Sequence, residues 1–315
     1  MDNTSTDSHV LQDHSATGRV RPWREHKESA QILHHAYANI DPSKSKRLAE
    51  CASRLVFKRA ENGGLKLTEA SFCRVRLCPM CTWRRSLKIS AQMHQIMGAI
   101  KQDQELAYIL VTLTQQSVEP AALKGEISNV LHAFSKLTRR RPFLSAVKGY
   151  YRAMEVTHNL RKNTYHPHIH AVFAVNKSYF ASRNYVSQAE WARLWRECLR
   201  LDYQPIVDVR KVKGDTADAV AEVAKYAVKP SDYIIPDDWD LTIETIKLLD
   251  DALDRRRFVS FGGVFGEYHR RLHLDDIEDG DLTDIGHDDD QLEPIKKDEG
   301  IAFIWWSGYR QYLRA

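Results

Sequence analysis

Three histidines alternate with other residues in the sequence HPHIH at residues 166–170, and an apolar run follows at residues 171–175. Successive side chains of a β-strand point to opposite faces, so the three histidines would share one face of a strand. Imidazole binds divalent transition metals, and two imidazoles at alternate positions, such as His168 and His170, can share one ion. A solvent-facing strand with incidental histidines gives the same pattern.

The strand at residues 165–175 is expected to pair with an earlier strand at 146–157, because only a polar link at 158–164 separates them. A tight turn in that link would place Glu155 opposite His168, on the histidine face. Two imidazoles and one carboxylate leave positions open on a divalent ion for water or a phosphate oxygen. Such a site is typical of catalysis rather than of structural support.

A second group of reactive side chains lies in the sequence ADAVAEVAKYAVK at residues 217–229. At 100° per residue, a helix would carry an apolar stripe on one side and Glu222, Tyr226 and Lys229 on the other. A phenol beside a cation can act as a nucleophile, and a carboxylate one turn away can act as a general base. An amphipathic helix with an ordinary polar face fits the same residues.

Four of the five cysteines lie close together: Cys73, Cys78 and Cys81 have four and two residues between them, and Cys51 precedes them. Four thiolates suit a tetrahedral Zn²⁺ ion, and the alternative is a set of buried or redox-active thiols. Cys198 is expected to be a core residue. The same segment carries side chains suited to phosphate contacts and base stacking, namely Arg74, Arg76, Trp83, Arg84 and Arg85.

The charge of the chain is unevenly distributed along its 315 residues, although the net charge is only +4. Residues 275–299 hold twelve acidic residues and two lysines, a local charge of −10 that leaves +14 for the rest. Such a basic excess suits a nucleic acid, and a solvated charged surface is the alternative. We find no apolar run of membrane-spanning length and no signal peptide, so we expect a cytoplasmic protein without a membrane partner.

The order of the expected elements favours an α+β fold with an antiparallel sheet backed by helices. The expected strands are at residues 108–114, 146–157, 165–175 and 206–212, and the expected helices at 83–100, 120–136, 187–201 and 216–228. The chain is divided into a disordered tail at 1–25, a cysteine-rich zinc module at 47–85, a main domain at 86–270, an acidic loop or insertion at 271–300 and a C-terminal segment at 301–315.

Three motifs occur in an order that resembles a known family: LVTLT at 110–114, HPHIH at 166–170 and EVAKYAVK at 222–229. The flanking sequences FCRVRLCPMCTWRRSL at 72–87 and RRFVSFGGVF at 256–265 are similar as well. The family is that of the replication initiators of rolling-circle plasmids, in the single-tyrosine group of the HUH endonuclease superfamily. The resemblance spans roughly residues 47–270 and identifies 86–270 as an HUH endonuclease domain with an RRM-like sheet.

The resemblance implies a mechanism and partners. His168, His170 and Glu155 would hold Mg²⁺ or Mn²⁺, and Tyr226 would attack the DNA to form a 5′-phosphotyrosyl link. Glu222 would activate water for the terminating cleavage, and Lys225 or Lys229 would steady the phosphate. The implied partners are plasmid origin DNA, single-stranded or in a hairpin, and a host helicase and polymerase.

Other functions remain open from the sequence. A single-tyrosine transposase or relaxase would use the same chemistry on another DNA element. A zinc-containing DNA-binding regulator would lack catalysis, and a metal-dependent phosphoesterase would form no covalent intermediate.

Overall fold

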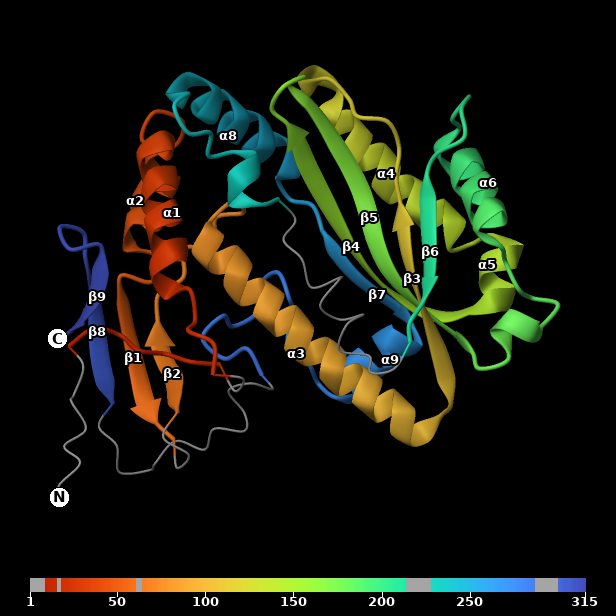
Figure 1. The fold of residues 1–315 in the computed structure, drawn as a ribbon, viewed down its shortest axis with the longest axis horizontal. Coiled ribbons are helices and arrows are strands. Elements are labelled where there is room, and N and C mark those ends of the chain that lie inside the picture. Colours follow the sequence, from red (N-terminus) through yellow and green to blue (C-terminus); the bar gives the residue numbers. More distant parts are fainter. Residues whose placement is uncertain (1–8, 16–17, 61–63, 214–227, 287–299) are drawn as a thin grey trace. The chain divides into compact units, whose positions relative to one another are not determined.

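The structure is a computed structural model that describes residues 9–15, 18–60, 64–213, 228–286 and 300–315. The chain divides into two compact units, each with its own antiparallel sheet (Figure 1). Unit 1 comprises residues 1–88 and 281–315, and unit 2 comprises residues 89–280. The predicted α+β class with antiparallel sheets is therefore confirmed.

The sheet of unit 1 combines strands from both ends of the chain. Its strand order is β2-β1-β8-β9, and its strands are β1 (Arg54–Arg59), β2 (Leu65–Ala70), β8 (Ile301–Trp306) and β9 (Gln311–Arg314). Arg54 of β1 pairs with Ile304 of β8, and Val10 forms a bridge to Leu313. The predicted C-terminal segment is thus a part of this sheet.

Two helices of unit 1 precede its sheet: α1 (Trp23–Tyr37) and α2 (Pro42–Glu50). Trp23 is only 2% exposed, and its indole N–H donates to Asp13 over 2.6 Å. The described part of the expected tail at residues 1–25 thus contains packed side chains, whereas a disordered segment was expected. Trp23 and Asp13 can be buried because each provides the hydrogen-bond partner of the other. The side chain of Asp41 caps α2 by accepting from two backbone N–H groups.

The sheet of unit 2 has the strand order β6-β3-β5-β4-β7, with every neighbouring pair antiparallel. Its strands are β3 (Leu106–Leu113), β4 (Val147–Asn159), β5 (Thr164–Asn176), β6 (Val207–Lys211) and β7 (Val259–Gly263). The first four correspond to the strands predicted from the sequence. Alternating apolar residues and the short polar link between β4 and β5 made this hairpin predictable.

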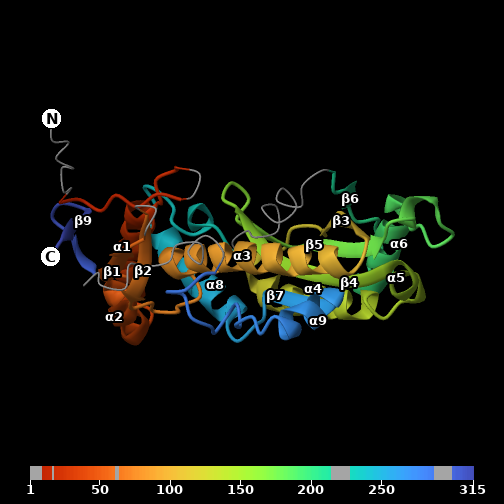
Figure 2. The same cartoon turned by 90° about the horizontal axis from the view of Figure 1, so that it is seen from below.

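Helices cover both faces of this sheet (Figures 1 and 2). Phe173 of β5 packs against Phe134, Phe143 and Trp191 on one face. On the other face, Val172 and Ala174 pack with residues from the later part of α3 and from α9. The helical segments are α3 (Pro79–Asp103, which begins in unit 1), α4 (Leu123–Leu137), α5 (Arg141–Ala146), α6 (Gln188–Leu199), α8 (Trp239–Leu253) and α9 (Val264–Arg271), with short 3-10 turns at Pro120–Ala122, Tyr179–Ala181 and Pro230–Asp232.

Strand β7 lies at an edge of the sheet and was not predicted from the sequence. Gly263, the last residue of β7, has a φ of +55°. It approaches β4 so closely that a Cβ atom would lie 2.3 Å from the Lys148 carbonyl oxygen. Glycine is therefore required there, which gives a structural reason for the glycine pair in the sequence RRFVSFGGVF. The helix predicted at residues 216–228 falls almost entirely outside the described residues.

The described part of the acidic segment, residues 275–286, is a loop. In unit 2, Asp276 accepts hydrogen bonds from the backbone N–H groups of Glu278 and Asp279 and forms an ion pair with Arg257. Glu278 accepts a hydrogen bond from the backbone N–H of Phe258 over 3.0 Å. The carboxylates of this part of the loop therefore fasten it to the end of β7.

Candidate active site and thiolate cluster

The histidine motif lies on β5, the middle strand of the unit 2 sheet. Glu155 of β4 is directly opposite His168, and Thr112 of β3 is directly opposite His170. Because side chains alternate between faces, these four residues share the face on which Val172 also lies. The cross-strand position expected for Glu155 from the hairpin is the one that the structure shows.

Three side chains converge on this face. The Glu155 Oε2 atom is 3.1 Å from His170 Nε2 and 3.4 Å from His168 Nε2. The two Nε2 atoms are 3.1 Å apart, and the potential ligand atoms all lie within 4.8 Å of one another. These three residues could therefore hold one cation between them.

Neighbouring groups orient both imidazoles. His168 Nδ1 is 3.0 Å from the carbonyl oxygen of His166, to which an Nδ1–H group can donate a hydrogen bond. Thr112 Oγ1 lies 3.3 Å from His170 Nδ1. His166 stacks on His168 with ring centroids 4.9 Å apart and does not join the three converging side chains. Such hydrogen bonds to the outer nitrogen are common for metal-binding histidines.

The carboxyl group of Glu155 is poised to be negatively charged. Its residue is 4% exposed, and this burial alone would raise the pKa. Hydrogen bonds from His168 and His170, with the positive charge of Lys229, outweigh burial and hold the Glu155 pKa well below its usual range. A buried anion beside two imidazole nitrogens is a favourable site for a divalent cation.

Lys229 belongs to the segment predicted to carry the nucleophile, and it reaches the same site. Its Nζ atom is 3.2 Å from Glu155 Oε1. The turn that follows is fixed by His158, whose Nδ1 lies 3.0 Å from the carbonyl oxygen of Asp232. Tyr226, Glu222 and Lys225, which the sequence analysis singled out, lie outside the described residues.

The cysteines form a second cluster, in unit 1. The Sγ atom of Cys51 is 3.6 Å from those of Cys78 and Cys81, and Cys73 Sγ is 3.6 Å from Cys81 Sγ. A disulfide would need about 2.05 Å, whereas four sulfurs at 2.3 Å from a tetrahedral zinc are about 3.8 Å apart. All four cysteines are buried, and the spacing fits Zn²⁺. Cys198 is buried in α6, apart from this cluster.

Backbone and side-chain donors surround the thiolate cluster. The backbone N–H of Cys73 donates to Cys51 Sγ, and that of Arg74 donates to Cys81 Sγ. Burial opposes ionisation of Cys81, but hydrogen bonds from the other three thiols and the charge of Arg85 lower its pKa. Burial and hydrogen bonds with neighbouring thiols raise the pKa of Cys51, Cys73 and Cys78, so among the four the protein surroundings favour a thiolate at Cys81 alone.

Lys27 supports this cluster, and the sequence analysis did not identify it. It is fully buried, and its Nζ atom donates to the carbonyl oxygens of Ala49 and Cys51 and to Ser53 Oγ. Burial lowers the Lys27 pKa, and the nearby thiolates oppose that effect. In the sequence Lys27 looks like a surface residue of a polar helix, so only the fold reveals its role.

Three residues predicted to contact DNA are instead buried in unit 1. Trp83 is 5% exposed and stacks on His26, and Arg85 is 9% exposed. Arg84 is fully buried and donates to the carbonyl oxygens of Leu282 and Thr283 over 2.8 and 2.7 Å. In this structure Trp83, Arg84 and Arg85 therefore pack within unit 1, and their role in DNA binding stays a prediction.

Comparison with known proteins decides the family. The profile of the Rep_1 family, described as "Replication protein", matches residues 64–313. The chain belongs to this replication-protein family. A "Protein rep" of Bacillus amyloliquefaciens is 38% identical, with 99% of each chain covered. A "Protein rep" of Streptococcus pneumoniae is 36% identical, covering 99% of this chain and 98% of its own. No solved structure matches the chain.

The resemblance to replication initiators is confirmed at the level of the family. Among the described residues of this replication protein, Arg74 is exposed and Arg76 half-buried, so these two remain candidates for DNA contacts. No helix in the described part of the replication protein is long and apolar enough to cross a membrane.

Proposed function

We propose that this replication protein is an origin-specific DNA nicking and joining enzyme that starts and ends rolling-circle replication of a plasmid. The observation that carries the proposal is the convergence of Glu155, His168 and His170 on one sheet face, with Lys229 bound to the same carboxylate. The histidine pair on the middle strand of an antiparallel sheet supports an HUH endonuclease fold for unit 2.

The three converging side chains would hold Mg²⁺ or Mn²⁺. Their nitrogen and carboxylate ligands suit Mn²⁺ somewhat better than Mg²⁺, which prefers oxygen. When bound, the ion polarises the scissile phosphate and stabilises negative charge on its oxygens. Thr112 and the His166 carbonyl oxygen would keep the two imidazoles aimed at that position.

Tyr226 would act as the nucleophile. Its phenolic oxygen forms a bond to phosphorus while the bond to the 3′ oxygen breaks, and the proton lost by the phenol is balanced by the proton that the 3′ oxygen gains. The products are a 5′-phosphotyrosyl ester and a free 3′-OH group. Lys229, three residues after Tyr226 in the sequence, contacts Glu155, which supports the assignment of the segment to this site.

The remaining polar residues would have supporting roles. Lys229 has a side chain that is 49% exposed, so it can neutralise Glu155 and still contact a phosphate. Lys225 would contact DNA, and Glu222 would activate water in the terminating cleavage. Hydrolysis or strand transfer would then resolve the phosphotyrosyl ester and free Tyr226.

Origin DNA would be bound by unit 2 and by the zinc module of unit 1. The four thiolates would hold a structural Zn²⁺ ion, and Arg74 would offer a cation beside it. We place this activity in the cytoplasm, with a host helicase and polymerase acting after the nick.

The test is a cleavage reaction with purified protein and single-stranded DNA from the origin of the plasmid that carries the gene. We expect a protein–DNA adduct that resists denaturation, requires Mn²⁺ or Mg²⁺ and disappears with EDTA. Tyr226→Phe should abolish the adduct. Tyr185→Phe, which removes a hydroxyl from a tyrosine that is 50% exposed elsewhere in unit 2, should leave it unchanged.

Other results would contradict the proposal. Cleavage without an adduct would indicate a hydrolytic phosphoesterase, and DNA binding without cleavage would indicate a regulator. An adduct that forms on the ends of a mobile DNA element, but not on a plasmid origin, would indicate a transposase or relaxase.

A further inference from the structure

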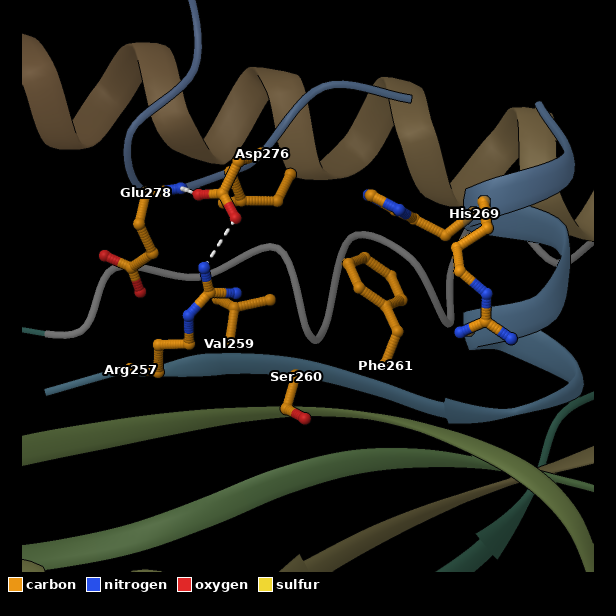
Figure 3. Close-up of a pocket in the computed structure, with 10 residues that line it drawn as sticks. Arg257, Val259, Ser260, Phe261, His269, Asp276 and Glu278 are labelled. Atoms are coloured by element: carbon orange, nitrogen blue, oxygen red, sulfur yellow. Dashed lines mark hydrogen bonds and ion pairs between the residues drawn. The ribbon is translucent and has the colours of Figure 1, made fainter. Parts of the chain in front are cut away.

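A cavity of about 190 Å³ lies in unit 2 beside the edge strand β7. It is bounded by β7, by α9 and by the acidic loop at residues 275–278 (Figure 3). The side chains that the argument uses are Arg257, Val259, Phe261, His269, Arg270 and Glu278. Part of this lining is the sequence RRFVSFGGVF, to which the proposed nicking reaction assigns no role.

Two rings form one wall of the cavity. The centroids of Phe261 and His269 are 4.8 Å apart, and the ring planes are tilted by 33° (Figure 3). Phe261 is half-buried rather than enclosed in the core. An exposed aromatic surface inside a cavity is a platform on which a planar base can stack.

Charged groups complete the lining. The side chain of Arg270 makes no hydrogen bond or ion pair with another described residue. Its guanidinium is exposed and suited to a phosphate. At the end of the cavity away from His269, Arg257 is paired with Asp276 beside Glu278 (Figure 3). Carboxylate oxygens accept hydrogen bonds from the N–H groups of a base.

The sheet register relates this cavity to the proposed cleavage site. His170 is opposite Ala153, and Ala153 is opposite Val259, which lines the cavity. The three side chains form one row across β5, β4 and β7 and lie on the same face. Two strand spacings separate the backbones at the ends of the row, which is about 10 Å. That distance corresponds to a few nucleotides of a DNA strand, which would pass outside the row because Ala153 is buried.

We propose that this cavity binds one nucleotide of the DNA strand, a few positions from the phosphate that is cleaved. The base stacks on Phe261 and His269, its N–H groups face the carboxylate end, and its phosphate is bound by Arg270. This inference rests on the proposed nicking function, because it takes the scissile phosphate to lie at Glu155, His168 and His170. A free nucleoside monophosphate has the same chemistry and must be distinguished from DNA.

The experiment scans origin DNA with single abasic sites placed within six nucleotides on either side of the nick. We expect one position at which loss of the base weakens binding about tenfold. In Phe261→Leu that position should lose its effect, because the stacking partner of the base is already missing. Arg270→Gln removes the phosphate contact instead, so it should weaken the binding of intact and abasic DNA alike. Arg255→Gln removes the same charge from an arginine whose side chain is 93% exposed outside the cavity, and should retain the full effect.

Each outcome has a separate meaning. If adducts form but no abasic position depends on Phe261, and Arg270→Gln binds origin DNA as tightly as the wild type, the cavity proposal is wrong while the nicking function stands. If no adduct forms with intact DNA, the nicking function itself fails. If deoxynucleoside monophosphates raise the melting temperature of the wild-type protein but not of Arg270→Gln, and the abasic scan is flat, the cavity binds free nucleotides instead. Unchanged zinc content and circular dichroism would show that the variants fold.

Discussion

The thiolate cluster of unit 1 and the histidine–glutamate cluster of unit 2 are both able to hold a cation, but they are built differently. The four cysteines are at most 7% exposed, and their sulfurs can fill a tetrahedral coordination sphere. The second cluster offers three ligands, and Lys229 beside it is half-exposed. A closed set of ligands suits a structural ion, and an incomplete one leaves room for a substrate oxygen.

The supporting residues differ in the same way. Around the thiolates, the backbone N–H groups of Cys73 and Arg74 and the buried Lys27 hold the chain in place. Around the second cluster, Thr112 and the His166 carbonyl oxygen touch only the outer nitrogens of the imidazoles. We therefore expect loss of the first cluster to change folding, and loss of the second to change reactivity.

The largest effect is expected for Cys78→Ser. If the four cysteines hold zinc as proposed, losing one of the four thiolates should lower the free energy of unfolding of unit 1 by more than about 5 kcal/mol, because metal binding and folding are coupled. Chemical denaturation with zinc quantified by atomic absorption would measure this. Cys198→Ser, in the core of α6, should retain a full equivalent of zinc, and equal zinc loss in both variants would refute the assignment.

A smaller effect, on reactivity alone, is expected for His168→Ala. Removing one ligand should reduce the rate of adduct formation by about 10²- to 10³-fold, which corresponds to about 3 to 4 kcal/mol in the barrier. Zinc content and the free energy of unfolding of unit 1 should not change. His132→Ala, on the exposed face of α4, is the matched control. A variant that lost zinc together with activity would break the contrast between the two clusters.

The next effect concerns the response of unit 1 to pH. Burial lowers the pKa of His26, which stacks on Trp83, to about 4. The pKa of His26 in the folded protein lies below the unfolded value of about 6.5, so the unfolded chain binds a proton first as the pH falls. The free energy of unfolding is therefore highest above pH 6.5 and decreases as the pH falls toward 4. Between pH 7.5 and 5 the wild type should lose about 2 kcal/mol more than His26→Phe, which keeps the stacking.

Denaturation curves at the two pH values would show this difference. Protonation of the cysteine thiolates also lowers the free energy of unfolding in this pH range, but it does so equally in the wild type and in His26→Phe. Parallel losses in wild type and His26→Phe would therefore rule out His26 as the cause.

The smallest effect is expected for Thr112→Val. The hydroxyl contacts His170 Nδ1, so its loss should weaken Mn²⁺ binding about tenfold without removing a ligand. Isothermal titration calorimetry with Mn²⁺ would measure the affinity. Thr114→Val, at the end of the same strand, where the hydroxyl bonds to the Ile206 carbonyl oxygen, should leave the Mn²⁺ affinity unchanged. Equal losses in both variants would point to a general effect on the sheet.

Local patterns in the sequence predicted much of unit 2. The alternation around His168 and His170 defined the strand and its histidine-bearing face, and the short link to β4 placed Glu155 across from them. The spacing of the cysteines similarly indicated a shared site. Each of these inferences depends on residues close together in sequence, or on a short hairpin whose register a few side chains determine.

Features that depend on distant segments could not be predicted. Arg84 looks like a DNA contact beside Trp83, but it binds carbonyl oxygens almost 200 residues later in the chain. The pairing of β8 with β1 joins positions some 250 residues apart, and no local pattern specifies it. Lys27 is a similar case, because nothing in its helix shows that Cys51 and Ser53 surround its ammonium group.

The arrangement of strands in unit 1 also bears on how the protein is synthesised. Strand β8 lies between β1 and β9, although β1 is translated about 240 residues before β8. While the nascent chain grows, one edge of β1 stays unpaired until β8 has left the ribosome. Unit 2, which ends at residue 280, is complete earlier. A prematurely terminated chain could therefore contain the histidine pair but lack the finished sheet of the unit that holds the four clustered cysteines.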